Sequence, residues 1–73
     1  MVYVFELFEA SADGTRNLIE VQKHRAKSVE AADHRARAII KSVVLFGKRA
    51  NLCVIKDQMG GTIKEVAIDA PAH

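Results

Sequence analysis

The residues best suited to chemistry lie in one stretch, KHRAKSVEAADHRARAIIK, which holds six of the eleven Lys and Arg residues. Cationic side chains contact phosphate oxygens, and the first N–H groups of a helix also favour anions. One hypothesis is therefore a nucleic-acid or anion-binding surface on a strand and the helix that follows it. Its candidate residues are Lys23, Arg25 and Lys27 on one face of the strand, and Arg37 and Lys41 one turn apart on the exposed helix face.

Three features of the sequence instead favour an ordinary solvated surface. Asp33 and Arg37 have the i, i+4 spacing of a helical ion pair. The stretch contains no aromatic residue, although proteins that bind single strands stack bases on aromatic rings. Residues 23–49 carry eight cations against two acids, but the remainder carries three against seven, which weakens attraction to a polyanion. Nucleic-acid binding is thus the alternative hypothesis.

No group of residues predicts catalysis. A nucleophilic enzyme needs Cys, Ser or Thr beside a base, but Cys53 lies in the apolar run LCVI, which is typical of a buried packing residue. QMGGT lacks the spacing of a phosphate-binding glycine loop, and the nine acids are scattered along the chain. We expect no catalytic residue, no cofactor and no enzymatic activity.

The candidate metal ligands are His24, His34 and His73, with Asp33 nearby. Their spacing matches neither a zinc finger nor the i, i+4 histidine pair of zinc proteases. His34 follows Glu30 by one helical turn, so a surface pair is the simpler account of it. We expect no metal site.

Length and composition are typical of one folded domain. The chain has 73 residues, of which 49% are hydrophobic and 27% charged. The single cysteine cannot form an internal disulfide, and VYVFELF lacks the features of a signal peptide. No apolar run approaches the roughly 20 residues that span a bilayer. We therefore expect a soluble cytoplasmic protein that makes no use of a membrane.

The first part of the chain predicts two strands. Residues 2–9 are rich in β-branched and aromatic side chains, and residues 16–26 would be the returning strand. Asp13-Gly14 between them is typical of a primed hairpin turn, in which Gly accepts and Asp tolerates a positive φ. In the second strand, Ile19 and Val21 would lie on one face and Glu20 and Gln22 on the other.

A helix is predicted over residues 29–46. Ser28 is a preferred N-cap, Glu30 complements the helix dipole, and Gly47 can end the helix in a left-handed conformation. A single helix over residues 17–46 is the alternative. That helix would place Arg25 in its apolar face, so a break near Ser28 is favoured. The helical spacing is carried by Val29, Ala32, Ala36, Ile39, Ile40 and Val43.

The last third predicts a second hairpin, with strands at 51–57 and 62–69 joined by QMGG, and a frayed tail at 70–73. The expected fold is therefore a single α+β domain: a four-stranded antiparallel sheet of ββαββ order with one helix packed on one face.

The first strand is apolar on both of its faces, and one helix can cover only one face of a sheet. Tyr3, Phe5 and Leu7 alternate with Val2, Val4 and Phe8. We therefore expect a homodimer in which a second copy buries the other sheet face or a strand edge.

The order ββαββ, with a strand running into AKSVEAADHRARAII, resembles a class of short uncharacterised bacterial proteins. In these proteins a hairpin leads through a small polar residue and an acidic first turn into an Ala-rich helix. The resemblance covers nearly the whole chain and rests on pattern; it implies the fold and a bacterial cytoplasmic setting, and it assigns no activity or functional residues. We predict a small non-enzymatic protein interaction or regulatory module, with a second copy and another protein as its partners.

Overall fold

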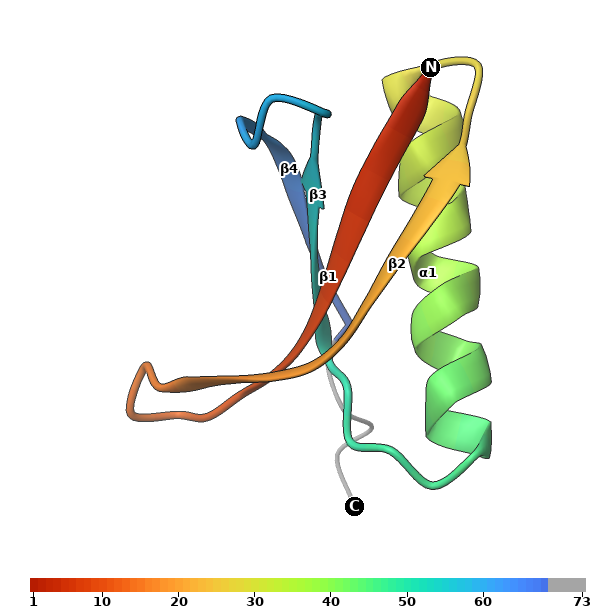
Figure 1. The fold of residues 1–73 in the computed structure, drawn as a ribbon. Coiled ribbons are helices and arrows are strands. Elements are labelled where there is room, and N and C mark those ends of the chain that lie inside the picture. The colour runs from red at the N-terminus through yellow and green to blue at the C-terminus, as the bar shows by residue number, and fades with distance from the viewer. Residues whose placement is uncertain (69–73) are drawn as a thin grey trace.

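The protein is a four-stranded antiparallel sheet with one helix on one side (Figure 1). The computed structural model describes residues 1–68. The elements are β1 (Val2–Ala10), β2 (Arg16–Arg25), α1 (Val29–Leu45), β3 (Leu52–Lys56) and β4 (Thr62–Ala67), and the sheet order is β2-β1-β3-β4. The predicted α+β fold of ββαββ order is thereby confirmed. The long helix over residues 17–46 is excluded, and the tail at 70–73 lies outside the described residues.

The ends of α1 are those that the sequence predicts. The Ser28 hydroxyl accepts a hydrogen bond from the Ala31 N–H at 3.1 Å, which satisfies one of the free donors of the first turn. Gly47 has a φ of 88°, and the N–H groups of Gly47 and Lys48 return to carbonyls of the last turn at 2.9 and 3.0 Å. Within residues 1–68, no helix is long and apolar enough to cross a membrane.

The core lies between α1 and one face of the sheet. Phe5, Leu7 and Ile55 are fully buried there. They pack against the apolar stripe of the helix, whose buried members are Ala32, Ala36, Ile39, Ile40 and Val43. The helix packs mainly on β3 and β4, and less on β1. The strand β2 therefore lies at the side of the helix and not beneath it.

Both hairpins have a three-residue loop of the same design. The Ser11 N–H donates to the Thr15 carbonyl at 2.9 Å, and the Gly14 N–H donates back to Ser11 at 3.0 Å. Residues 57–61 repeat these two bonds at 2.9 and 3.1 Å. Gly14 and Gly60, with φ of 91° and 87°, hold the left-handed position that such a loop requires.

The prediction of a primed turn at Asp13-Gly14 is wrong. Glycines are the residues with positive φ in the described part of the chain, so Asp13 does not have the conformation that this turn needs. Its carboxylate instead accepts hydrogen bonds from the Thr15 N–H at 3.0 Å and from the Thr15 hydroxyl at 2.7 Å. The loop has three residues, one more than a two-residue primed turn, and is stabilised by the hydrogen bonds between Asp13 and Thr15.

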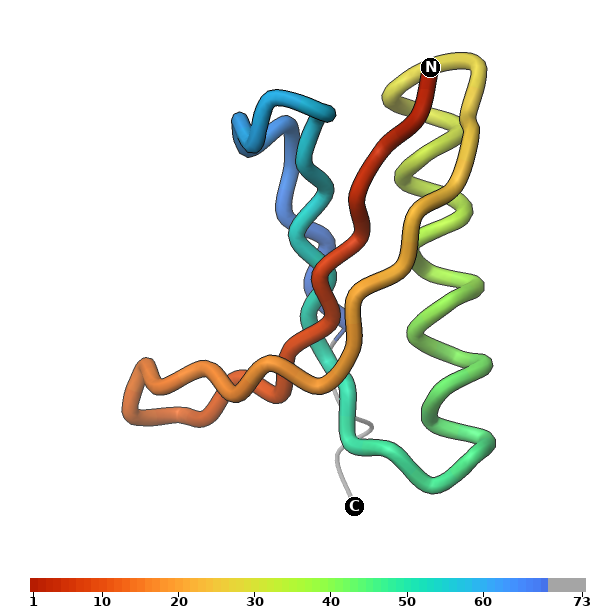
Figure 2. Tube along the Cα trace, viewed as in Figure 1, coloured from red at the N-terminus to blue at the C-terminus, as the bar shows by residue number. Residues whose placement is uncertain are grey.

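A bulge in β2 changes the expected pattern of its faces. Leu7 pairs with Glu20 and Phe8 with Leu18, so Ile19 has no partner in β1. The simple alternation that would place Ile19 with Val21 is therefore interrupted at the bulge. Beyond it, the β1–β2 hairpin bends away from the helix (Figure 2).

Asn51 fastens the hairpin where it bends. Its side-chain oxygen accepts from the Ala10 N–H at 2.8 Å, and its amide donates to the Ala10 carbonyl at 3.0 Å. These two bonds let the side chain stand in for a strand neighbour of β1, just before β3 begins. The residue that precedes β3 thus stabilises the bend of the hairpin.

Candidate functional site: the open face of the sheet

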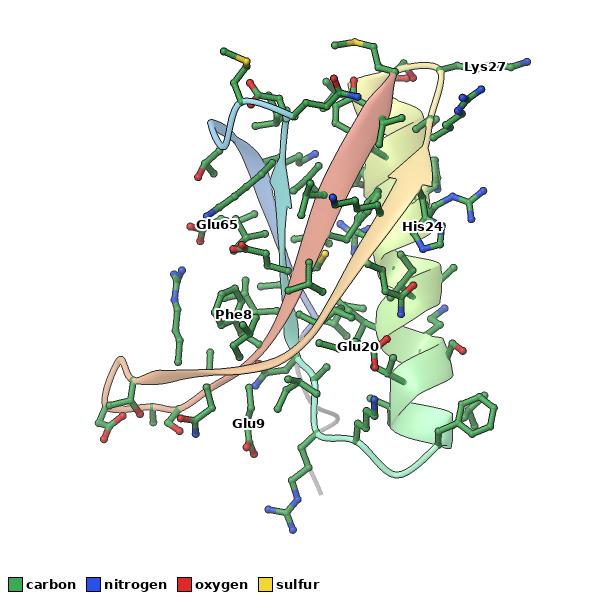
Figure 3. All side chains as sticks on the ribbon, viewed as in Figure 1. Phe8, Glu9, Glu20, His24, Lys27 and Glu65 are labelled. Atoms are coloured by element: carbon green, nitrogen blue, oxygen red, sulfur yellow. The ribbon has the colours of Figure 1, made fainter. Side chains whose placement is uncertain are left out.

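The side of the sheet that α1 leaves uncovered is largely apolar. Phe8 alternates with the core residues of β1 and projects away from the helix (Figure 3). Cross-strand partners share a face, so the pairing of β1 with β2 and β3 extends this surface to both sides. We call it the open face; its larger apolar members are Val2, Val4, Phe8, Leu18, Val21, Leu52 and Val54.

The open face combines buried and exposed apolar side chains. Leu52 and Val54, in the middle of the sheet, are shielded by their neighbours and are each 5% exposed. Leu18 and Val21, on β2, are 56% and 48% exposed. Apolar area of this kind on an uncovered sheet face is typical of surfaces that meet another protein.

The bent hairpin makes one end of the open face concave. A hollow of about 340 Å³ lies there, between the hairpin and the ends of β3 and β4. Arg16 reaches from the hairpin to Glu65 on β4, with its guanidinium 3.1 Å from the carboxylate. Since both side chains are about half exposed, this pair adds little stability.

Charges interrupt the apolar surface at the other end of the open face. Lys56 lies 3.1 Å from the Glu6 carboxylate, so these two charges compensate each other. Lys23 and Arg25 stand opposite Val4 and Val2 on β1 and are exposed. Neither forms an ion pair with a residue in the described part of the chain. The open face therefore has a basic end.

The predicted basic residues are divided by the fold. Lys23 and Arg25 lie on the open face, and Lys27 lies in the exposed segment between β2 and α1 (Figure 3). Arg37 and Lys41 lie on α1, which packs on the opposite face of the sheet. Three of the five cations thus lie at the end of β2 or just after it, and the other two belong to a different surface.

Arg37 takes part in an ion-pair cluster that fastens α1 to β4. Its Nε lies 3.2 Å from Asp33, which confirms the predicted helical pair, and Lys64 of β4 approaches the same carboxylate at 3.3 Å. Partial burial raises the pKa of Asp33, but the hydrogen bonds from Arg37 and Lys64 outweigh it and leave that pKa below its ordinary value. The Arg37 side chain is therefore already paired with Asp33, within the contact between α1 and β4.

The other side of β2 carries a polar ladder of three side chains. Gln22 donates to Glu20, and the His24 Nε2 donates to the Gln22 side-chain oxygen at 2.7 Å. Glu20 and His24 are on the helix side of the sheet (Figure 3), where Lys48 also donates to Glu20. The hydrogen bonds from Lys48 and Gln22 lower the pKa of Glu20.

His24 closes the ladder against the edge of the core. Its ring meets that of Phe5 edge to face, with 5.6 Å between the centroids. Sequence reasoning placed Glu20 and Gln22 together but attached no role to them. The alternation of polar and apolar residues indicated that these side chains share a face. It did not indicate that this face would lie at a sheet edge beside the helix.

Cys53 is fully buried in the core, as predicted. Burial, together with the negative charge of Glu6, raises the pKa of its thiol to about 12. A thiol with such a pKa holds almost no thiolate at neutral pH, and thiolate is the reactive form. Cys53 therefore packs and does not act as a nucleophile.

The histidines do not converge on a shared site. Across residues 1–68, no three His, Cys, Asp or Glu side chains lie together closely enough to hold a metal ion. His24 is engaged with Gln22 and Phe5, His34 is exposed on α1, and His73 lies outside the described residues.

A second apolar patch lies at the end of α1. Leu45 and Phe46 are 86% and 84% exposed, and Val44 beside them is also exposed. Sequence reasoning assigned Phe46 to the helix without placing it on the surface. The patch is small and lies apart from the open face, at the C-terminal end of the helix.

Comparison of the chain with protein-family models, with curated proteins and with solved structures gives no match.

Proposed function

We propose that this chain is a small non-enzymatic interaction module whose first partner is a second copy of itself. The observation that carries the interaction role is the open face, where Leu18, Val21 and their neighbours present apolar area that no described residue covers. Self-association is assigned to the edges of the sheet. The free edges of β2 and β4 add unpaired backbone groups on either side of the sheet. Small domains often gain stability by association, because they bury little apolar area alone.

In the proposed assembly the open face is left for a protein partner. Its concave end is lined by apolar side chains and by one exposed ion pair, Arg16 with Glu65, and its other end is basic. That combination suits a partner segment with apolar anchors and acidic flanks. The proposed setting is the cytoplasm of a bacterium, which agrees with a chain whose single cysteine is buried.

The oligomeric state tests the proposal directly. Light scattering coupled to size exclusion should give a mass twice 8.0 kDa at submillimolar concentration, with dissociation on dilution. A constant monomer mass over that range would contradict self-association. Arg35→Gln, a change on the exposed side of α1, is a control that should leave the mass unchanged.

A second candidate function is binding of nucleic-acid phosphates by the basic end of β2. Lys23, Arg25 and Lys27 support it, because each is exposed and has no ion-pair partner among residues 1–68. Binding to mixed-sequence DNA should then weaken steeply with salt, with a slope of about −0.9 in log K for each neutralised phosphate. No binding at low salt would remove this function.

A further inference from the structure

We propose that two copies of this chain pair edge to edge through β2, antiparallel and about a two-fold axis at Gln22, so that their sheets become continuous. This pairing rests on the proposed self-association and names the surface that performs it. It follows from the direction of the β2 backbone groups, from the register that the side chains allow, and from the position of the helix.

The backbone groups of Val21 and Lys23 point away from β1. Opposed residues of an antiparallel pair alternate between exchanging both backbone hydrogen bonds and exchanging none. Ala26 and Met1 exchange both backbone hydrogen bonds, at 2.9 and 3.3 Å. His24 and Gln22 lie two and four residues before Ala26, so their backbone groups also bond to β1. Val21 and Lys23 alternate with them and are directed to the free edge, where another strand can add.

Three registers bring these outward groups of two copies together, with the axis at Val21, Gln22 or Lys23. An axis at Lys23 sets that side chain directly against Lys23 of the second copy, which is unfavourable. An axis at Val21 requires Ile19, which lies in the bulge and breaks the regular strand. An axis at Gln22 uses residues 20–24 alone, the regular part of β2.

The Gln22 register is self-complementary in its side chains. On the helix side, Glu20 stands opposite His24 of the second copy, and the symmetry repeats this contact on the other side of the axis. A carboxylate opposite an imidazole is a favourable cross-strand pair. On the open face, Val21 stands opposite Lys23, whose aliphatic stem can cover it. In an antiparallel pair of β2 strands, the polar ladder therefore sets the acid of each copy against the base of the other, and Gln22 against Gln22.

The position of α1 leaves room for this pairing. The helix packs on β3, β4 and β1, and the helix side of β2 is partly exposed at Glu20, Gln22 and His24. In the joined sheet both helices lie on the same side, separated by the two β2 strands. The open faces also lie together on the other side and stay free for a protein partner.

Proline substitution at the free edge tests the pairing. Lys23→Pro removes an N–H that points to solvent in the monomer and bonds to Val21 of the second copy in the dimer. Lys23→Ala is the matched control, since it removes the same charge and keeps the N–H. In sedimentation equilibrium, Lys23→Pro should raise the dimer dissociation constant at least ~10-fold over Lys23→Ala, because two symmetric hydrogen bonds are lost.

A charge exchange tests the register without proline. His24→Glu alone sets a new carboxylate against Glu20 of the second copy and should weaken the dimer. The double variant Glu20→His with His24→Glu restores an acid opposite an imidazole, and should recover the wild-type dissociation constant to within about 3-fold if the axis lies at Gln22. Circular dichroism of each variant establishes that the monomer fold is kept.

Each other result overturns the pairing in a distinct way. Equal dimerisation of Lys23→Pro and Lys23→Ala, or a double variant no tighter than His24→Glu, excludes this edge or this register while leaving the proposed function standing. Loss of the dimer in Leu18→Ser or Phe46→Ser, with Lys23→Pro unaffected, assigns the second copy to the open face or to the helix end. A wild-type chain that stays monomeric removes the proposed self-association itself.

Discussion

The two faces of the sheet differ in how they meet water. On the covered face, Phe5, Leu7 and Ile55 are fully buried beneath α1, and no charged side chain lies in that core cluster. On the open face, apolar side chains alternate with ion pairs such as Lys56 with Glu6. The covered face stabilises the domain, whereas the open face tolerates water and keeps apolar area for a partner.

This difference also explains the two sides of β2. The helix does not extend over this strand as it does over β3 and β4, so the side chains on its helix side are polar and bond to one another. The same strand presents Val21, Lys23 and Arg25 on the open face. An edge strand beside a helix can therefore carry polar residues toward the core side without burying a charge.

The largest expected effect separates two phenylalanines of β1. Phe5→Ala empties the core and should lower the free energy of unfolding by about 3–5 kcal/mol, enough to unfold much of a small domain. Phe8→Ala, on the open face, should cost less than half of that because its side chain is already partly in water. Urea unfolding followed by circular dichroism measures both changes. Equal losses would contradict the contrast between the faces.

The next largest difference in the free energy of unfolding is expected between two variants of β3, one with a hydroxyl on the covered face and one with a hydroxyl on the open face. Cys53→Ser buries a hydroxyl among apolar atoms and should cost about 1–3 kcal/mol. Val54→Thr places a hydroxyl on the open face, where Glu6 and Glu65 are the cross-strand neighbours, and should cost less than about 1 kcal/mol. The midpoints of urea unfolding give the comparison. A larger loss in Val54→Thr would indicate that the open face is as dry as the core.

Asp33→Asn should reduce stability near neutral pH by a smaller amount, because it weakens the contacts of α1 with Lys64 on β4. The folded-state pKa of Asp33 is lowered, so its contribution is present above the ordinary aspartate pKa of about 3.9 and is lost as the pH falls through the folded value. Wild type and variant should therefore converge in acid. Thermal unfolding at a series of pH values tests this, and a difference that persists in acid would argue for a packing effect.

The smallest effect is expected for the ion pair that spans the concave end of the open face. Arg16→Ala, Glu65→Ala and the double variant should show a coupling of at most about 0.5 kcal/mol, since both side chains are about half exposed. The coupling should vanish at high salt. A double-mutant cycle by urea unfolding measures it, and a larger, salt-resistant coupling would mean that the pair anchors the hairpin.

The amino-acid sequence by itself determined the helix and the four strands. Ser28 and Gly47 mark the ends of α1 because a cap and a left-handed residue are local requirements. The alternation of Tyr3, Phe5 and Leu7 with Val2, Val4 and Phe8 separated two apolar faces of β1, because the side chains of a strand alternate between faces. Both signals act over a few residues, so they can be read without knowing the fold. The packing of α1 decided which of the two faces is buried.

Only the tertiary structure decided which residues share a surface. Lys23 and Arg37 lie close in the sequence but on surfaces separated by the sheet. The bulge at Ile19 and the bonds of Asn51 to Ala10 follow from strand pairing between distant segments. The lateral position of α1, set by packing on β3 and β4, leaves the polar ladder of β2 at a free edge. These features depend on contacts distant in sequence, which local propensity and periodicity do not encode.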